Sequence, residues 1–201
     1  MSIMTTELIL GICLGLGLAA ACGFRVFVPL FLMSLSARAG YLELADSFAW
    51  IDSWAALVMF GVATLIEVGA YYIPWVDNLL DAVATPAAVI AGTIATAASV
   101  TDVSPLIQWS AAIIGGASVA GVVQTSSVLL RSTSSVTTAG LGNAAVSTIE
   151  WIGSAVMSLV AIILPVVAGL IVVSLTAAAI IFLTRRRRPR STVPRDSAIH
   201  S

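Results

Sequence analysis

The sequence predicts an all-α integral membrane protein with about five transmembrane helices, and three observations support this fold class. Of the 201 residues, 59% are hydrophobic and only 9% are charged, whereas a soluble domain carries roughly a quarter charged residues. The apolar residues occur in runs long enough to cross a bilayer as helices. These runs lack the period-two alternation of a membrane β-barrel. Lipid must therefore solvate much of the outer surface.

Five hydrophobic stretches account for the predicted spans. They cover residues 8–35, 54–72 and 77–100, a segment that begins near residue 106, and residues 149–183. The second stretch ends in the string YYIPW, whose aromatic side chains are typical of the headgroup region of a bilayer. The first and last stretches are longer than the roughly 20 residues that one span needs.

Both long stretches contain residues that interrupt helices. Gly23 and Pro29 lie in the second half of the first stretch, and Pro165 and Gly169 lie near the middle of the last one. Proline lacks an amide N–H and clashes with the preceding turn, so we expect a kink or break in each stretch. If the last stretch forms two short spans instead of one long helix, the total rises to six.

Positive charge is concentrated at one end of the sequence. There is no lysine, and six of the nine arginines follow residue 184 in the segment RRRRPRSTVPR. Arginine-rich flanks of spans remain in the cytoplasm, so we predict a multi-pass protein of the cell inner (plasma) membrane with a cytoplasmic C-terminus. Residues 185–201 are expected to form a disordered tail that contacts anionic lipid headgroups. Five spans place the N-terminus outside and the Arg38 loop in the cytoplasm, and six spans reverse both.

An internal repeat is a further hypothesis. Seven residues within 15–40 are identical to the residues 100 positions later. We therefore predict one transmembrane domain over residues 1–184 with two related halves, residues 8–100 and 106–184. If three spans separate the copies, the halves have inverted orientations and interrupted helices, an architecture that many secondary transporters use.

Three strings in the sequence resemble a known family. They are ACGFRVFVPL (21–30), IEVGAYYIPWVDNLLDAVATPAAVIAG (66–92) and TTAGLGN (137–143). These strings are similar to a bacterial family of integral membrane proteins, the domain-of-unknown-function family 4126. The resemblance covers roughly residues 8–175. It implies an integral membrane protein, but it brings no established activity and therefore assigns no catalytic residue.

Glu67 is the most informative candidate site residue. It lies in the middle of the second predicted span, where a carboxylate costs about 2.5 kcal/mol or more unless it is paired, protonated or next to a wet cavity. One interpretation is a proton or cation site or a substrate contact, and the other is a structural ion pair with Arg25. Arg25 itself lies between Gly23 and Pro29, where an interrupted helix exposes backbone amides that favour an anion.

Further polar residues complete the predicted site. Arg131 lies in a Ser/Thr-rich segment that looks interrupted, where it either binds an anion together with Arg25 or extends to the membrane interface. Asp77 and Asp81 share one helical face, and they are interpreted as a cap for the third span, with a metal or proton site as the alternative. Glu150 is interpreted as an ordinary span boundary. The predicted substrate- or ion-binding residues are Arg25, Glu67, Asp77, Asp81, Gln124 and Arg131.

The sequence gives little support to an enzyme. Its only histidine, His200, lies in the predicted tail, which removes the usual general base and any histidine-ligated metal site. The motifs HExxH, GxSxG, Walker A and CxxC do not occur. We therefore expect no enzymatic activity, no cofactor and no resident metal. The arginine-rich tail has neither the aromatic residues nor the fold that nucleic-acid binding needs.

These observations favour a small transporter, channel or lipid-translocating protein for an anionic substrate, with proton coupling through Glu67. The alternative is a membrane scaffold or accessory subunit whose small-residue face, residues 115–121, binds other helices. Either protein is a candidate homo-oligomer. Transport predicts a water-accessible cavity around Glu67 and Arg25, whereas a scaffold predicts that these two residues are buried against each other.

Overall fold

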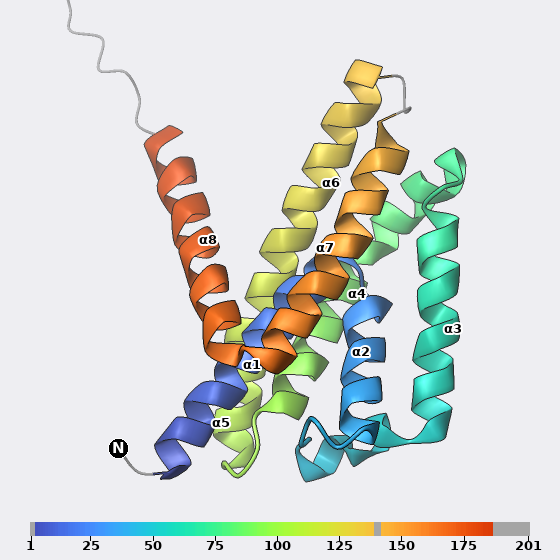
Figure 1. The fold of residues 1–201 in the computed structure, drawn as a ribbon. Coiled ribbons are helices and arrows are strands. Elements are labelled where there is room, and N and C mark those ends of the chain that lie inside the picture. Colours follow the sequence, from blue (N-terminus) through green and yellow to red (C-terminus); the bar gives the residue numbers. More distant parts are fainter. Residues whose placement is uncertain (1–2, 139–141, 187–201) are drawn as a thin grey trace, which may run out of the picture.

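The protein is all-α, as the sequence predicts. Its computed structural model describes residues 3–138 and 142–186, and all secondary structure in these ranges is helical (Figure 1). The helices are α1 (Ile3–Phe24), α2 (Phe27–Arg38), η1 (Asp46–Asp52), α3 (Trp54–Ala70), α4 (Pro74–Ser99), α5 (Pro105–Ser110), η2 (Ala111–Ala117), α6 (Ser118–Thr138), α7 (Asn143–Ile163) and α8 (Pro165–Arg186). A 3₁₀ helix forms η1, and η2 is a π-helix that joins α5 to α6. The predicted tail lies outside the described residues, except for its first two arginines, which end α8.

The two breaks that the sequence predicts are present. Arg25 and Val26 separate α1 from α2. In the last hydrophobic stretch, the backbone leaves the helical region at Leu164, and α8 begins at Pro165. Proline fits the first position of a helix because its missing N–H has no helical partner there. The last stretch is therefore two helices and not one long kinked helix.

The first break reverses the direction of the chain. Figure 1 shows α1 leading away from the end of the bundle where the N-terminus lies, and α2 running back towards that end. Arg38, the last residue of α2, therefore lies at the same end as the N-terminus. The prediction that the two lie on opposite sides is wrong, because the first stretch forms two helices with a reversal between them instead of a single span.

The number of candidate spans is lower than predicted. Three segments are long and apolar enough to cross a membrane, Thr5–Phe24, Pro105–Ser134 and Ala144–Ile163. A fourth candidate combines Asp46–Asp52 with Trp54–Ala70, which meet at a bend of 65°. The described residues thus offer three to four spans where the sequence predicts five or six. The difference arises partly because the two breaks leave short apolar helices, α2 and the described part of α8.

The structure does not confirm the predicted inverted repeat. In Figure 1, α1 and α5 both begin near the lower end of the bundle, whereas inverted halves begin on opposite sides of the membrane. The break at Arg25 also has no counterpart 100 residues later, because Thr125 lies within the continuous helix α6.

The polar segment around Arg131 is helical and not interrupted as predicted, and its hydroxyl groups find partners within the helix. Thr125, Ser126, Ser132 and Thr133 each donate a side-chain hydrogen bond to the carbonyl oxygen four residues earlier, at 2.7 to 2.9 Å. Such bonds satisfy the hydroxyls on the backbone of their own helix. These four side chains therefore need no partner outside their own helix.

Helix α1 lies at the centre of the bundle. Leu18 and Cys22 are fully buried, and α4, α6, α7 and α8 pack around α1. The approach to α4 is very close at Gly15, where an added Cβ would lie 2.8 Å from the Cα of Thr96. This central position of α1 places the break that follows it in the protein interior.

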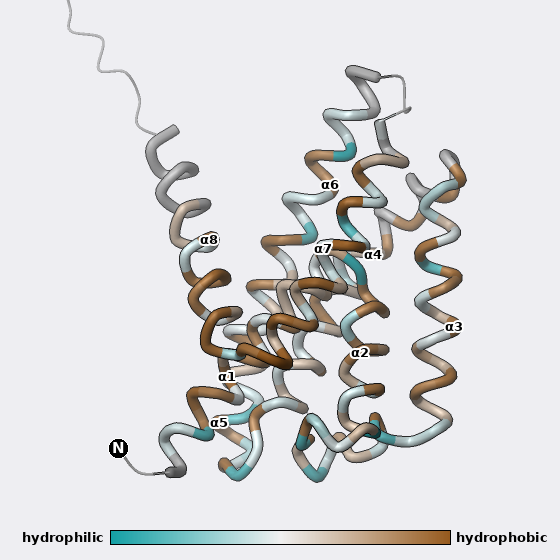
Figure 2. Tube along the Cα trace, in the orientation of Figure 1, coloured by the Kyte–Doolittle hydropathy of each residue, from teal (hydrophilic) through white to brown (hydrophobic). Residues whose placement is uncertain are grey.

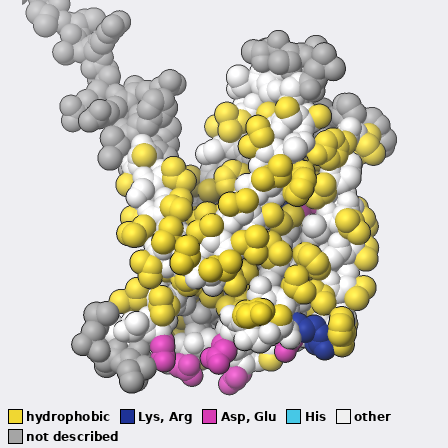
Figure 3. All heavy atoms as spheres, in the orientation of Figure 1, with side chains coloured by type: hydrophobic (Ala, Val, Ile, Leu, Met, Phe, Trp, Pro, Cys, Tyr) yellow, Lys and Arg dark blue, Asp and Glu magenta, His cyan; other side chains and the backbone are white. Residues whose placement is uncertain are grey.

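The outer surface is apolar. Figure 2 shows hydrophobic residues along α3, α7 and the first turns of α8, and Figure 3 shows apolar side chains across the middle of the visible face. Leu65 and Ile66 of α3 are large apolar residues that remain exposed. Acidic side chains lie along the lower edge in Figure 3. A broad apolar surface with acidic side chains gathered at one edge is typical of a membrane protein.

Candidate functional site

The break between α1 and α2 places Arg25 inside the protein. Its side chain is only 1% exposed. The Nη2 group donates to the Glu150 carboxylate at 3.0 Å and to the Ser147 carbonyl oxygen at 3.3 Å. Both acceptors belong to α7. Arg25 therefore ties the break in the first hydrophobic stretch to a helix more than a hundred residues later in the sequence.

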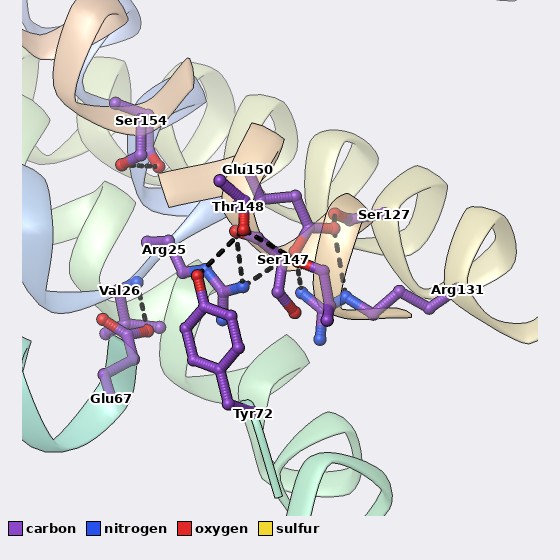
Figure 4. A network of polar contacts seen from close by, with 12 residues as sticks. Arg25, Val26, Glu67, Tyr72, Ser127, Arg131, Ser147, Thr148, Glu150 and Ser154 are labelled. Atoms are coloured by element: carbon purple, nitrogen blue, oxygen red, sulfur yellow. Dashed lines mark hydrogen bonds and ion pairs between the residues drawn. The ribbon is translucent and has the colours of Figure 1, made fainter. Parts of the chain in front are cut away.

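Glu150 also binds a second buried arginine. Arg131 of α6 donates through Nε to Glu150 Oε1 at 3.0 Å and through Nη2 to Glu150 Oε2. The hydroxyl of Ser127, one turn earlier on α6, donates to Oε1 as well. Figure 4 shows these side chains converging from α6, α7 and the α1–α2 break. We call the group Arg25, Arg131 and Glu150 the buried ion cluster.

An aromatic ring covers both arginines of the buried ion cluster. The Arg25 guanidinium lies 3.7 Å from the centroid of the Tyr71 ring, and that of Arg131 lies 4.3 Å from it. Tyr71 follows α3 directly and is itself buried. The negative face of its ring favours a cation. The ring therefore adds to the stabilisation of two like charges that one carboxylate only partly compensates.

One interpretation of the sequence predicts an ion pair between Glu67 and Arg25, but the structure does not show this pair. Its two carboxylate oxygens accept hydrogen bonds from the backbone N–H groups of Val26 and Phe27, at 2.8 and 2.9 Å. These N–H groups lie at the N-terminus of α2, where they have no helical partner and where the helix dipole favours a negative charge. A residue of α3 therefore supplies the cap that α2 lacks locally.

Several polar atoms around the buried ion cluster have no hydrogen-bond partner in the described part of the chain. They are Nε and Nη1 of Arg25, Nε2 of Gln124 and the hydroxyl of Ser147. Gln124 is fully buried on α6. It lies three residues before Ser127, so the two side chains share one face of the helix. Free donors in a buried site are costly. They give the site an unused capacity to bind an acceptor.

The structure brings some of the predicted site residues together and does not test others. The structure brings Arg25 and Arg131 together and places Glu67 at the same break. Asp77 and Asp81 belong to the first half of α4, but their side chains lie outside the described residues. Their proposed role therefore stays a prediction. No group of three or more metal-ligating side chains occurs in residues 3–138 and 142–186 as the structure describes them.

Glu150 is the site residue that the sequence interpretation missed. It looks like a span boundary because it begins the last hydrophobic stretch, yet it is buried and holds both arginines. One signal was available in the sequence. Two arginines in apolar or uncharged segments need a carboxylate partner, and few carboxylates lie outside the loops.

A groove opens next to the buried ion cluster. It has a volume of about 270 Å³ and lies between α2, α3 and α4. Only Glu67 and Tyr71, among the residues that line it, carry polar side-chain atoms. Arg25 does not line the groove. The groove therefore lies beside Glu67 but not beside Arg25, and its apolar walls differ from the water-accessible cavity around both residues that transport predicts.

The fold and site together define a helical membrane-type protein with a charged cluster enclosed at a helix break. The chain belongs to the family described as Domain of unknown function (DUF4126), whose profile matches residues 12–185. This match confirms the family resemblance of the sequence. No curated protein and no solved structure matches the chain.

Proposed function

We propose that the protein is a small membrane transporter for an anionic substrate, with the binding site at the break between α1 and α2. The observation that carries the proposal is the composition of the buried ion cluster. It holds two arginines and one carboxylate, and two of the nitrogen atoms of Arg25 have no partner. Two arginines with free donors in a buried site favour an anion in addition to Glu150, and the Glu67 carboxylate now lies near both arginines. We expect no enzymatic activity.

Glu67 marks the place where the substrate binds. Its carboxylate accepts the N–H groups of Val26 and Phe27 at the N-terminus of α2, as a phosphate or carboxylate ligand does at other helix N-termini. Figure 4 shows the Arg25 guanidinium between Glu67 on one side and Glu150 on the other. Glu67 is therefore an internal substitute for the substrate anion.

Competition between Glu67 and the substrate provides the proton coupling. Two carboxylates, or a carboxylate and a phosphate, repel each other at close range. Protonation of Glu67 removes this repulsion and frees the α2 amides, so one proton accompanies one anion. The charged and titratable groups around Glu67 are Arg25, Arg131, Cys22, Tyr71 and Glu150.

The charges at the two ends of the molecule support an orientation. Helix α8 leads towards the upper end of the bundle in Figure 1, and the arginine-rich segment follows it in the sequence. We place this end in the cytoplasm by the positive-inside rule, in contact with anionic headgroups of the inner membrane. The acidic edge of Figure 3 and the N-terminus then face outwards.

A scaffold or accessory subunit is the second candidate, and the small-residue face over 115–121 no longer favours it. An added Cβ on Gly116 would lie 2.6 Å from the carbonyl oxygen of Gly92, and one on Gly115 would lie 2.9 Å from Leu16. These glycines pack against α4 and α1 of their own chain. They are therefore not free to bind the helices of a partner.

Transport in liposomes tests the proposal. We expect uptake of small anions or flipping of anionic lipids by the reconstituted protein, with a rate that rises as the pH falls. Glu67→Gln should retain transport and lose its pH dependence, because glutamine is neutral at every pH. Arg25→Gln should abolish transport.

The control is Arg38→Gln, which changes an arginine at the edge of the bundle and should leave the rate unchanged. If Glu67→Gln keeps the pH dependence of the wild type, proton coupling through Glu67 is wrong. If Arg25→Gln folds and transports like the wild type, the proposed site is wrong.

A further inference from the structure

The groove beside the buried ion cluster is open to the surface that faces lipid. Ile66 of α3 and Val83 of α4 line the groove and are 66% and 57% exposed. Both residues are large exposed hydrophobics and therefore form part of the apolar outer surface of the molecule. A ligand can therefore enter sideways from the hydrocarbon region, without passing through water.

The inner end of the groove coincides with the proposed anion site. Val26, Phe27 and Glu67 line the groove, and the same three residues form the hydrogen-bonded N-terminus of α2. Tyr71 lines the groove too, while its ring covers the guanidinium of Arg25. A ligand in the groove thus has apolar walls along its length and charge-binding groups at one end.

The size and chemistry of the groove select a hydrocarbon chain. Its volume of about 270 Å³ is below the roughly 300–1,000 Å³ of a site that encloses a drug-sized molecule. Its apolar walls cannot replace the water shell of a free, hydrophilic anion. They do match an alkyl chain, whose methylene groups make dispersion contacts with apolar protein surface as they do with lipid.

We infer that the substrate is an anionic lipid, with its hydrocarbon chain in the groove between α2, α3 and α4 and its single carboxylate or phosphate group at the N-terminus of α2. This inference rests on the proposed function, since it names the substrate class of the same site. The headgroup takes the two N–H groups that Glu67 now occupies, next to the buried ion cluster.

A lipophilic cation is the competing ligand, because Glu67 is the one formally charged residue that lines the groove. The observations favour the anion. Both oxygens of Glu67 are already engaged by the α2 amides. Two arginines lie behind Tyr71, and their positive charges repel a second cation. A long-chain amine is therefore one arm of the test.

Photocrosslinking in lipid nanodiscs tests the inference on the full-length protein. The probe is a long-chain alkyl sulfonate, which stays charged across the pH range, with a diazirine on the chain. We expect crosslinks at groove residues such as Phe27 and Ala63. Unlabelled alkyl sulfonate, long-chain alkyl phosphate or fatty acid should displace the probe.

Three competitors separate failure of this inference from failure of the proposed function. If methanesulfonate or inorganic phosphate competes as well as the long-chain anion, the anion site stands and the lipid substrate is wrong. If a fatty alcohol of equal length competes as well, the anion site itself is wrong. If the long-chain amine competes best, the ligand is a cation and both proposals fail.

A pair of neighbouring substitutions provides the structural control. Ala63→Trp fills the groove, so it should weaken binding of the long-chain anion roughly tenfold or more. Val62→Trp adds the same side chain at an exposed position that does not line the groove, and it should leave binding unchanged. Ala63→Leu should give an intermediate loss, which guards against misfolding of the tryptophan variant. Equal binding by all three variants would overturn the inference.

Discussion

Two arginines of this protein have similar partners in different surroundings. Arg38 lies 3.6 Å from the carboxylate of Asp52, and Arg25 lies 3.0 Å from that of Glu150. Each guanidinium also lies on an aromatic ring, at 4.0 and 3.7 Å from the centroid. The side chains of the first pair are 31% and 52% exposed, whereas those of the second are 1% and 5% exposed.

Burial and the number of charges, more than the contact geometry, decide how much the loss of one partner costs in each pair. Water screens the Arg38–Asp52 pair, so losing either partner leaves a hydrated charge at little cost. The Arg25–Glu150 pair is enclosed, and Arg131 shares its carboxylate. Removing one member there strands a charge in a region of low dielectric constant. The exposed pair is thus a local contact, while the buried ion cluster joins α6, α7 and the α1–α2 break.

The largest effect is expected for Glu150→Gln. This change removes the carboxylate that hydrogen-bonds to both buried guanidiniums, and it should lower the free energy of unfolding by about 3–5 kcal/mol. Denaturant titration of the detergent-solubilised protein measures the loss. Asp52→Asn, the matched change in the exposed pair, should cost less than about 1 kcal/mol. Equal costs for the two changes would show that the cluster is not enclosed.

A smaller effect is expected for the coupling between Arg25 and its partners. Arg25→Met should cost less than Glu150→Gln, because Arg131 and Glu150 then remain as a balanced pair. In a double-mutant cycle, Arg25 and Glu150 should show a coupling energy of about 1–3 kcal/mol, and Arg25 and Glu67 a smaller one. A larger coupling with Glu67 would restore the ion pair that the sequence predicts.

The smallest effect is expected for Arg38→Met. The loss of free energy of unfolding should be about 0–1 kcal/mol and should shrink further at high salt, because salt screens exposed charges. The cost of Arg25→Met should change little with salt. A cost of Arg38→Met that exceeds the cost of Arg25→Met would reverse the comparison.

Local signals in the sequence predicted the helices and one break of the site. Gly23 and Pro29 predict the break near Arg25, although not the reversal of the chain there, and Pro165 marks the start of α8. Glu67 stands out because a carboxylate in an apolar run is costly. In each case the sequence signal lies within a few residues of the structural feature that it predicts.

The partners within the site could not be predicted in this way. Glu150 lies 125 residues from Arg25, and only the packing of α7 against the break brings them together. The backbone amides that hold Glu67 are equally invisible in the sequence, since any residue type at the start of α2 supplies an N–H. The polar segment around Arg131 is predicted to be interrupted, but its hydroxyls bond to their own helix. The amino-acid composition gives no sign of these bonds.

The separation of Arg25 from Glu150 also sets an order of events during synthesis. Glu150 follows Arg25 by 125 residues, and a ribosome that adds roughly 5–20 residues per second needs about 6–25 s to translate them. Throughout that time the nascent chain holds Arg25 without its carboxylate, and the first hydrophobic stretch cannot reach its final arrangement. Insertion of α1 and α2 is therefore completed after translation of α7, and a ribosome stalled before residue 150 leaves an arginine that the insertion machinery must shelter.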